Sequence, residues 1–396
     1  RGHPVKDEQL RFSVVAIWAP NGWRFIILYG LAFGLESAVV NFNRLPMLGI
    51  AIARRCTASI SAAYFDDELA LELLRDASVS RLGVLSAFTL LGSPPQPTKG
   101  FPTAADRTYL GTSIHVGAVP DELCIYVQPK DSTVHKLTTR IDQAIAQRSL
   151  DMQEASKLRG DAMWLFSMTA GKIGKLAGPL LSRCQRGESI LNEKDITYLS
   201  FLRRAACCPI PRSIPLFRTS DQLVRIYSDA SFENGILRLG WVIFAPEYPR
   251  PVGRTAVVDV SILDRWLPRR QQIFPGEAVC ALCVPIFHSQ ALRNRDVLYF
   301  IDNEAAASSL VRGTSTQEDV HDIALSAALW FHQAGSRVWC EWVDTKSNPS
   351  DGLSRQGVED PWTASQGWDL CEVTLPEWLC SPHSLTEMWE AYLTDV

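Results

Sequence analysis

Residues 221–231 read DQLVRIYSDAS. The apolar run LVRIY, interrupted by a single arginine, predicts a strand that is buried on at least one face. The run stops at Asp229, and an Asn-Gly pair at 234–235 follows as a turn signal. An acidic side chain at the end of a buried strand costs free energy unless a positive charge meets it. This stretch therefore predicts both a buried strand and a site for a cation.

Three further acids follow in similar settings: Glu277 in IFPGEAVCALC, Asp302 in VLYFIDNEAAA and Asp351 in SNPSDGLSR. Converging carboxylates repel one another, which raises their pKa values unless a cation is shared. A few oxygen ligands suit Mg²⁺ that also binds water and phosphate oxygens. Asp229, Glu277, Asp302 and Asp351 are thus predicted to be catalytic metal ligands, for Mg²⁺ or Mn²⁺, in a two-metal site that cleaves phosphodiesters.

Each acid also has a purely structural interpretation. Asp229 could be a turn acid, and Glu277 follows Pro-Gly in the first turn of an expected helix, where the helix dipole favours a negative charge. Asp302 could cap the next helix, and Asp351 lies in an ordinary helix-start turn. The recurrence of four such acids after 219 favours the metal site.

Composition limits the class of protein. The chain has 396 residues, of which 46% are hydrophobic and 21% charged, so it is expected to be globular with two or three domains. The net charge of -4 excludes a generally basic nucleic-acid-binding surface but not a local basic groove. Ten scattered cysteines and the lack of a visible secretory signal predict a reducing, intracellular (cytoplasmic or nuclear) location. The apolar stretch 25–40 is too short and too interrupted to span a membrane.

The first half alternates short strands and helices by pattern. We expect a hairpin over 10–29, a helix over 36–55, a strand over 57–64, a helix over 68–88, and strands over 108–116 and 123–127. A basic helical region follows over 131–185, then a proline-rich linker over 207–218. From 219 the pattern gives three strands and then alternating helices and strands, which predicts an α/β domain with a mixed sheet.

Several motifs, taken in order, resemble those of a known family. LAFGLESA, YFDD, the loop with Lys99 and TYLG resemble the palm motifs of retroelement reverse transcriptases. YSDAS, GEAVCAL, FIDNEAA and NPSDGLSR resemble the RNase H domain that follows in the same polyprotein. NPSDGLSR is similar to RNase H domains of LTR and tyrosine-recombinase (DIRS-like) retroelements.

The resemblance assigns roles to individual residues of the first half. Asp66 and Asp67 match the metal-binding aspartates of the palm, and Gly34 matches the segment that shapes the nucleotide and template pocket. Lys99 matches a lysine near the incoming triphosphate, and Leu110 and Gly111 match the primer-grip hairpin. Lys172 and Lys175, on the basic helical stretch placed like a thumb, are predicted to contact phosphates.

The resemblance implies four segments within an overall α/β class: a partial palm with α+β structure (1–118), a helical thumb and connection with the linker (119–218), an RNase H-like domain with a mixed sheet (219–358) and a C-terminal tail (359–396). The partners implied are an RNA–DNA hybrid, an RNA template with a DNA primer, and, if the polymerase is complete, dNTPs, with no membrane. The palm of the family has one further aspartate, which we do not find, so RNA-strand cleavage is expected rather than DNA synthesis. Two alternatives remain open: an RNase H-fold nuclease or transposase, and a catalytically inactive nucleic-acid-binding protein derived from such an element.

Overall fold

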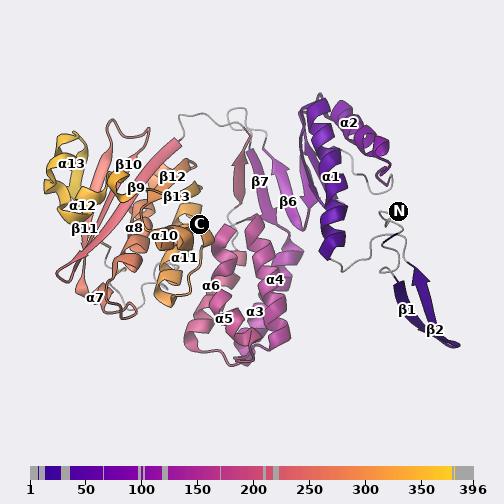
Figure 1. Cartoon of the computed structure of the whole chain (residues 1–396), viewed down its shortest axis with the longest axis horizontal. Helices are drawn as coiled ribbons and strands as arrows, with labels where there is room; N and C mark the ends of the chain where they lie inside the picture. Colours follow the sequence, from indigo (N-terminus) through magenta and orange to yellow (C-terminus); the bar gives the residue numbers. More distant parts are fainter. Residues whose placement is uncertain are drawn as a thin grey trace. The chain divides into compact units, whose positions relative to one another are not determined.

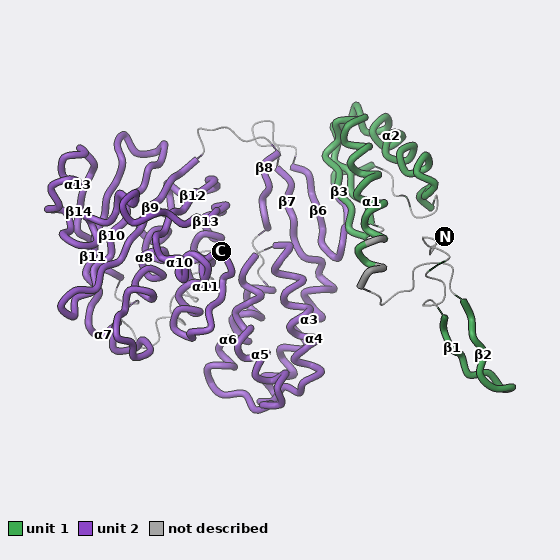
Figure 2. Tube along the Cα trace, in the orientation of Figure 1, with its two compact units in different colours: residues 1–105 green, residues 106–396 purple. Residues whose placement is uncertain are grey.

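The computed structural model describes residues 8, 14–27, 36–65, 67–96, 100, 103–117, 124–169, 171–207, 211–216, 223–376 and 379. The chain divides into two compact units, residues 1–105 and 106–396 (Figure 2). This division falls at 105/106, whereas the sequence suggested a boundary at 118/119. Within the described residues, no helix has both the length and the hydropathy needed to cross a bilayer.

The described part of the first unit forms two hairpins and two helices. Its elements are β1 (Val14–Ala19), β2 (Gly22–Ile27), α1 (Glu36–Thr57), β3 (Ile60–Tyr64), β4 (Asp67–Leu71) and α2 (Ala77–Leu90). A small core of apolar side chains joins α1 to α2, centred on Ile50 and Phe88. Among the described residues of this unit, the strands pair within their own hairpins, β1 with β2 and β3 with β4.

The helix expected over 68–88 was wrong in its first part. Residues 67–71 form β4, which pairs antiparallel with β3 from Tyr64↔Asp67 to Ile60↔Leu71. Glu, Leu and Ala favour helices, but a partner strand across a tight turn outweighs these modest local preferences. Phe65 adopts a positive φ of 54° in that turn, so the chain reverses there and cannot continue into a helix.

The second unit begins with a small sheet and a group of helices. The sheet has the order β5-β6-β7-β8 and is antiparallel throughout. Its strands are β5 (Asp106–Tyr109), β6 (Thr112–Val116), β7 (Cys124–Pro129) and β8 (Arg212–Pro215). The helices are α3 (Asp131–Gln147), α4 (Met152–Met168), η3 (Gly171–Lys175), α5 (Gly178–Gln185) and α6 (Glu193–Cys207). We call residues 131–207 the helical module.

Two sequence expectations for this region need correction. The single strand expected over 108–116 is a hairpin, because Leu110 and Gly111 take φ values of 48° and 80° and turn the chain between β5 and β6. The expected linker 207–218 contains β8, which pairs with β7. An edge strand tolerates proline because one side of its backbone needs no partner strand, and β8 is at the edge of its sheet.

The rest of the second unit is a mixed sheet with helices on its faces (Figure 1). The strands are β9 (Leu223–Glu233), β10 (Ile236–Phe244), β11 (Val252–Val258), β12 (Asp296–Ile301), β13 (Arg337–Trp342) and β14 (Asp369–Glu372). Their order is β13-β12-β9-β10-β11-β14. The strands β9, β10 and β11 are antiparallel, whereas β12 and β13 run parallel to β9. The expected α/β class with a mixed sheet is confirmed.

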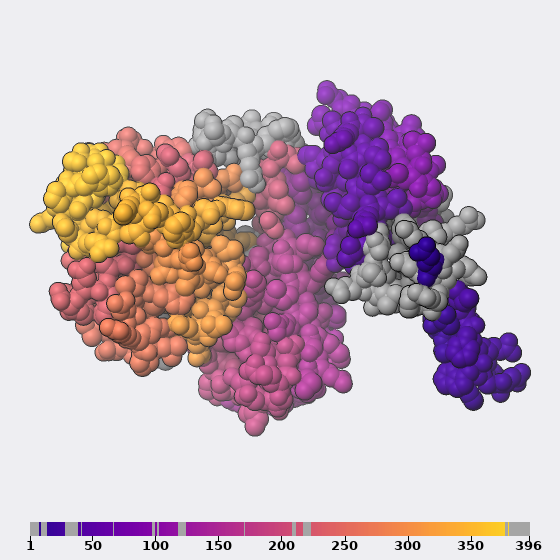
Figure 3. Space-filling model, in the orientation of Figure 1, coloured from indigo at the N-terminus to yellow at the C-terminus, as the bar shows by residue number. Residues whose placement is uncertain are grey.

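The helices of this part are α7 (Val260–Leu263), α8 (Ile273–Phe287), α9 (Ser289–Leu292), α10 (Glu304–Arg312), α11 (Glu318–Gln333), α12 (Asp351–Arg355) and α13 (Pro361–Ser365), with η5 (Thr345–Ser347) and η6 (Gly357–Glu359) between them. Gly276 of α8 lies against Ala230, and Gly240 lies against Ser354 of α12. Side chains alternate along a strand, so α8 and α12 cover opposite faces of the sheet. The yellow segment in Figure 3 includes α12, α13 and β14, and β14 extends the sheet in parallel beside β11.

Candidate active site

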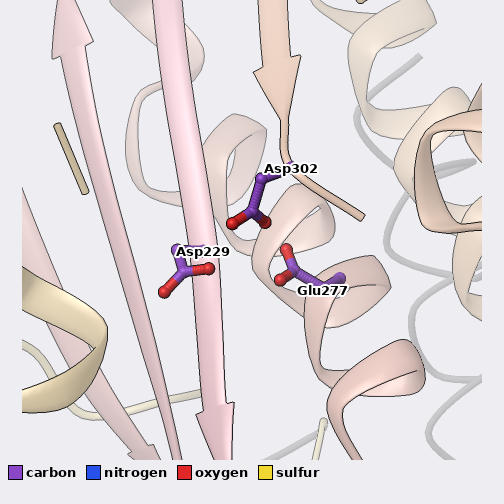
Figure 4. A group of neighbouring side chains, drawn as sticks. All are labelled: Asp229, Glu277 and Asp302. Carbon is purple, nitrogen blue, oxygen red and sulfur yellow. The ribbon is translucent and has the colours of Figure 1, made fainter. Parts of the chain in front are cut away.

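Three of the predicted acids meet at one place. Asp229 comes from β9, Asp302 follows the last residue of β12, and Glu277 comes from α8 (Figure 4). One carboxylate oxygen from each lies within 4.8 Å of the others. The strand register explains why Asp229 and Asp302 meet. Ile301 of β12 pairs with Ser228 of the parallel strand β9, and an aspartate follows each of these two residues in the chain.

The third acid, Glu277, is held by the close approach of α8 to the sheet. A Cβ on Gly276 would lie 2.8 Å from Leu237 Cδ1 and 3.2 Å from Ala230 Cβ, so only glycine allows this contact without a shift of its neighbours. Glu277 Oε1 then accepts a hydrogen bond from the Ala230 backbone N–H at 3.1 Å. Its other oxygen, Oε2, is buried without a hydrogen-bond partner in the described part of the chain.

Burial and mutual repulsion raise the pKa values of two of these acids. Asp229 is only 5% exposed. Its burial, followed by the charges of Asp302 and Asp351, raises its pKa to about 7, although a hydrogen bond from Ser354 acts in the opposite direction. Glu277 is 1% exposed, and burial followed by the charges of Asp229 and Asp302 raises its pKa well above the ordinary value. A shared cation would relieve this repulsion.

These features fit a divalent metal. The donors are all carboxylate oxygens, they converge, and Glu277 Oε2 is buried with no other ligand. A buried polar atom without a partner is costly, and metal coordination would satisfy it. Asp229, Glu277 and Asp302 are therefore the residues that could hold Mg²⁺ or Mn²⁺.

The fourth predicted acid lies outside this group. Asp351 is the first residue of α12, and its Oδ1 accepts a hydrogen bond from Arg355 Nε at 2.9 Å. Its charge nevertheless contributes to the raised pKa of Asp229. The assignment of Asp351 as a metal ligand stays a prediction.

Sequence reasoning missed the residues that orient these acids. Ser354 Oγ donates to Asp229 Oδ2, and the buried Asn348 donates from Nδ2 to the Ser228 carbonyl at 2.9 Å. Trp342 Nε1 donates to the carbonyl of Asp302 at 3.0 Å. The only available signal was that Asn348 and Ser354 lie within the NPSDGLSR motif, since their partners are more than one hundred residues away.

The residues assigned to the palm are placed as follows. Gly34, Asp66 and Lys99 lie outside the described residues. Asp67 is exposed at the start of β4. Leu110 and Gly111 form the β5–β6 turn, where Trp164 Nε1 of α4 donates to the Leu110 carbonyl at 3.1 Å.

The two lysines predicted to bind nucleic acid have protein partners. Lys172 Nζ donates to the carbonyl of Leu310, and Lys175 Nζ donates to the carbonyl of Arg312. Both carbonyls lie in the last turn of α10. Burial of Lys172 lowers its pKa, which is the usual effect of desolvating an ammonium group. In the structure these lysines join the helical module to α10.

Comparison with known proteins gives structural similarity alone. No protein-family model and no curated protein sequence matches the chain. An N-terminal RNase H domain from Mycobacterium tuberculosis, solved as a fusion with maltose-binding protein, is 13% identical, with a TM-score of 0.29 over 36% of this chain and 97% of that chain. RNase H1 from Halobacterium salinarum NRC-1 is 16% identical, with a TM-score of 0.27 over 35% of this chain and 98% of that chain.

A longer match involves a viral enzyme. The foamy viral protease-reverse transcriptase in complex with dsDNA is 12% identical, with a TM-score of 0.41 over 87% of this chain. The match spans 65% of that viral chain. A second foamy viral structure is also 12% identical, with a TM-score of 0.40 over 86% of this chain and 54% of the viral chain. At such low identities and TM-scores, a functional conclusion has to rest on the carboxylate site.

Proposed function

We propose that the second unit is a metal-dependent ribonuclease H, which cleaves the RNA strand of RNA–DNA hybrids, and that it belongs to a retroelement reverse transcriptase. The observation that carries the proposal is the convergence of Asp229, Glu277 and Asp302 within 4.8 Å of one another. The resemblance of their surrounding motifs to those of RNase H domains supports the choice of substrate. The finer assignment to LTR or DIRS-like elements rests on the NPSDGLSR motif alone.

The residues have separable roles in such a reaction. Asp229 and Asp302 would supply oxygen ligands from adjacent strands, and Glu277 would add Oε2 while the Ala230 N–H holds Oε1. Bound Mg²⁺ or Mn²⁺ ions would supply Lewis-acid activation of water and stabilise the leaving 3′ oxygen. The hydrogen bond from Ser354 lowers the pKa of Asp229 against the effect of burial, and so favours the ionised form that a cation requires. Selectivity for RNA would come from contacts to the 2′-hydroxyl and from the shape of the hybrid.

DNA synthesis is not part of this proposal. The palm of the family uses a third aspartate that we do not find, and Asp67 is exposed in a two-stranded hairpin. The residues from LAFGLESA to TYLG still indicate a polymerase ancestry, with RNA template and DNA primer as partners, and dNTPs only if the polymerase is complete. Primer extension with the full chain is expected to give no product.

One assay tests the nuclease. The full chain is incubated with a labelled RNA–DNA hybrid and Mg²⁺, beside the variants Asp302→Asn and Asp264→Asn. Asp264 is an exposed acid at the end of α7 and is the matched control. Cleavage by the wild type and by Asp264→Asn, but not by Asp302→Asn, supports the proposal. Hybrid binding without cleavage by the wild type contradicts it and indicates an inactive nucleic-acid-binding protein instead.

A further inference from the structure

Helix α10 connects the carboxylate site to the helical module. It starts two residues after Asp302, where Asn303 caps it by accepting a hydrogen bond from the Ala306 N–H at 3.0 Å. It ends at Arg312, and its rise of roughly 1.5 Å per residue makes it a short rigid rod. Any shift of its far end therefore moves the backbone that carries Asp302.

The far end of α10 is fixed by two lysines from η3. The last carbonyls of a helix have no partner within the helix, and cations there also interact favourably with its dipole. Lys172 donates to the Leu310 carbonyl and Lys175 to the Arg312 carbonyl. Both bonds cross from the helical module to the domain that carries the three acids.

Gly313 allows this close contact. It ends α10 with a φ of 64°, in the left-handed region that favours glycine. A Cβ at this position would lie 2.6 Å from Cδ of Lys172, so the aliphatic stem of the lysine fills the space that a larger residue would need. The lysine stem and the helix end are therefore packed together, and their contact is not a loose surface ion pair.

The next helix is attached to the same module by other groups. The hydroxyl of Tyr198 donates to Asp322 Oδ1 at 2.6 Å, and Lys194 Nζ lies 3.2 Å from Asp322 Oδ2. The ring of His321 approaches the Leu176 carbonyl at 3.4 Å. Because α11 is held independently, loss of the lysine contacts would free α10 without separating the domain from the module.

We propose that Lys172 and Lys175 are positioning residues that fix α10, and through it Asp302, so that metal binding by the three acids depends on the helical module. This inference rests on the proposed function. It assigns the two lysines an effect on the metal site, whereas the sequence predicted contacts with phosphates. The two roles predict different effects of the lysines. A positioning role changes the affinity for the metal, whereas a phosphate-contact role changes the affinity for nucleic acid.

The test uses the full chain with Lys172→Met and Lys175→Met, singly and together, since methionine keeps the aliphatic stem and removes the ammonium group. The matched control is Lys157→Met, which removes an ammonium group from α4 of the same module. Among the described contacts, this ammonium group bonds only to Glu154, at 2.7 Å. Mn²⁺ binding is measured by calorimetry, and the protection of α10 amides by hydrogen exchange. Cleavage is followed as a function of Mg²⁺ and hybrid concentration.

We expect the double variant to bind Mn²⁺ roughly tenfold more weakly, which is the lower end of the loss caused by removing groups that orient metal ligands. Its α10 amides should exchange faster, its half-saturating Mg²⁺ concentration should rise, and its KM for the hybrid should stay unchanged. Lys175→Arg should restore Mn²⁺ affinity, because arginine still donates to the carbonyl. Lys175 is half-buried and its bond to the Arg312 carbonyl lies at the surface, so the single Lys175→Met variant gives a readout even if Lys172→Met fails to fold.

Unchanged Mn²⁺ affinity in folded variants would overturn the inference. A higher KM for the hybrid with a smaller salt dependence, at unchanged Mn²⁺ affinity, would also overturn it and restore the phosphate-contact role. If the wild type binds Mn²⁺ and cleaves the hybrid while the variants match it, only this inference fails. If the wild type does neither, the proposed function fails, and the inference fails with it.

Discussion

Asp229 and Asp302 each lie one residue beyond the pair Ile301↔Ser228, which joins the neighbouring parallel strands β12 and β9. Two negative charges at this spacing repel each other in a partly desolvated site, and Glu277 adds a third. The raised pKa of Asp229 is a direct consequence. Because the fold forces these charges together, the stability of the second unit should depend on protons and on divalent cations.

The first prediction concerns pH in the absence of metal. Folding raises the pKa of Asp229 from its ordinary 3.8 to about 7, so between these values the folded state binds the proton more tightly than the unfolded state. Stability should therefore fall as pH rises through this window. Denaturant unfolding in EDTA at a series of pH values measures this, and Asp229→Asn should flatten the curve. Equal slopes for wild type and variant would contradict the assignment.

The second prediction adds the cation. A ligand that binds only the folded state stabilises it by about 2.7 kcal/mol at a concentration 100 times its Kd. Mn²⁺ should therefore raise the melting temperature of the wild type, and more at pH 8 than at pH 5, where protons compete for the carboxylates. Glu277→Gln should lose most of this rise. A melting temperature that Mn²⁺ raises equally in both proteins would place the ion elsewhere.

The third prediction concerns the serine that orients Asp229. Ser354→Ala removes the donor to Asp229 Oδ2, so the pKa of Asp229 should rise further and the affinity for Mn²⁺ should fall by roughly 10- to 100-fold. Ser365→Ala is the control. Among the described contacts, the Ser365 hydroxyl bonds only to two near neighbours in the chain, the Trp362 carbonyl at 2.6 Å and the Gln366 side chain. Calorimetry compares the two variants, and equal affinities would show that Ser354 does not support the site.

The sequence predicted the site better than its surroundings, for a physical reason. An apolar run that ends in an acid is a local signal, so the strand that leads to Asp229 was predicted from the sequence. The structure brings Asp229, Glu277 and Asp302 together, and their role as metal ligands stays a prediction. The contacts of Ser354 and Lys172 bridge 125 and 138 residues, and no local pattern encodes such a distance. β4 was taken for helix for the same reason, since its partner strand decided its conformation.

The last prediction tests whether α12 must contact the sheet closely. A Cβ on Gly240 would lie 2.4 Å from the Ser354 backbone nitrogen, and the chain there cannot yield without moving α12. Gly240→Ala should therefore destabilise the protein by about 1–3 kcal/mol, as overpacking does, and should weaken Mn²⁺ binding by displacing Ser354 from Asp229.

Gly160→Ala provides the matched control for this glycine. Gly160 lies in α4, where an added Cβ would meet nothing within 4 Å, so alanine should raise stability by about 0.4–1 kcal/mol and leave Mn²⁺ affinity unchanged. Urea unfolding and calorimetry measure both effects. If Gly240→Ala binds Mn²⁺ as the wild type does, Ser354 keeps its contact with Asp229 despite the added methyl group. The close approach of α12 would then serve packing alone.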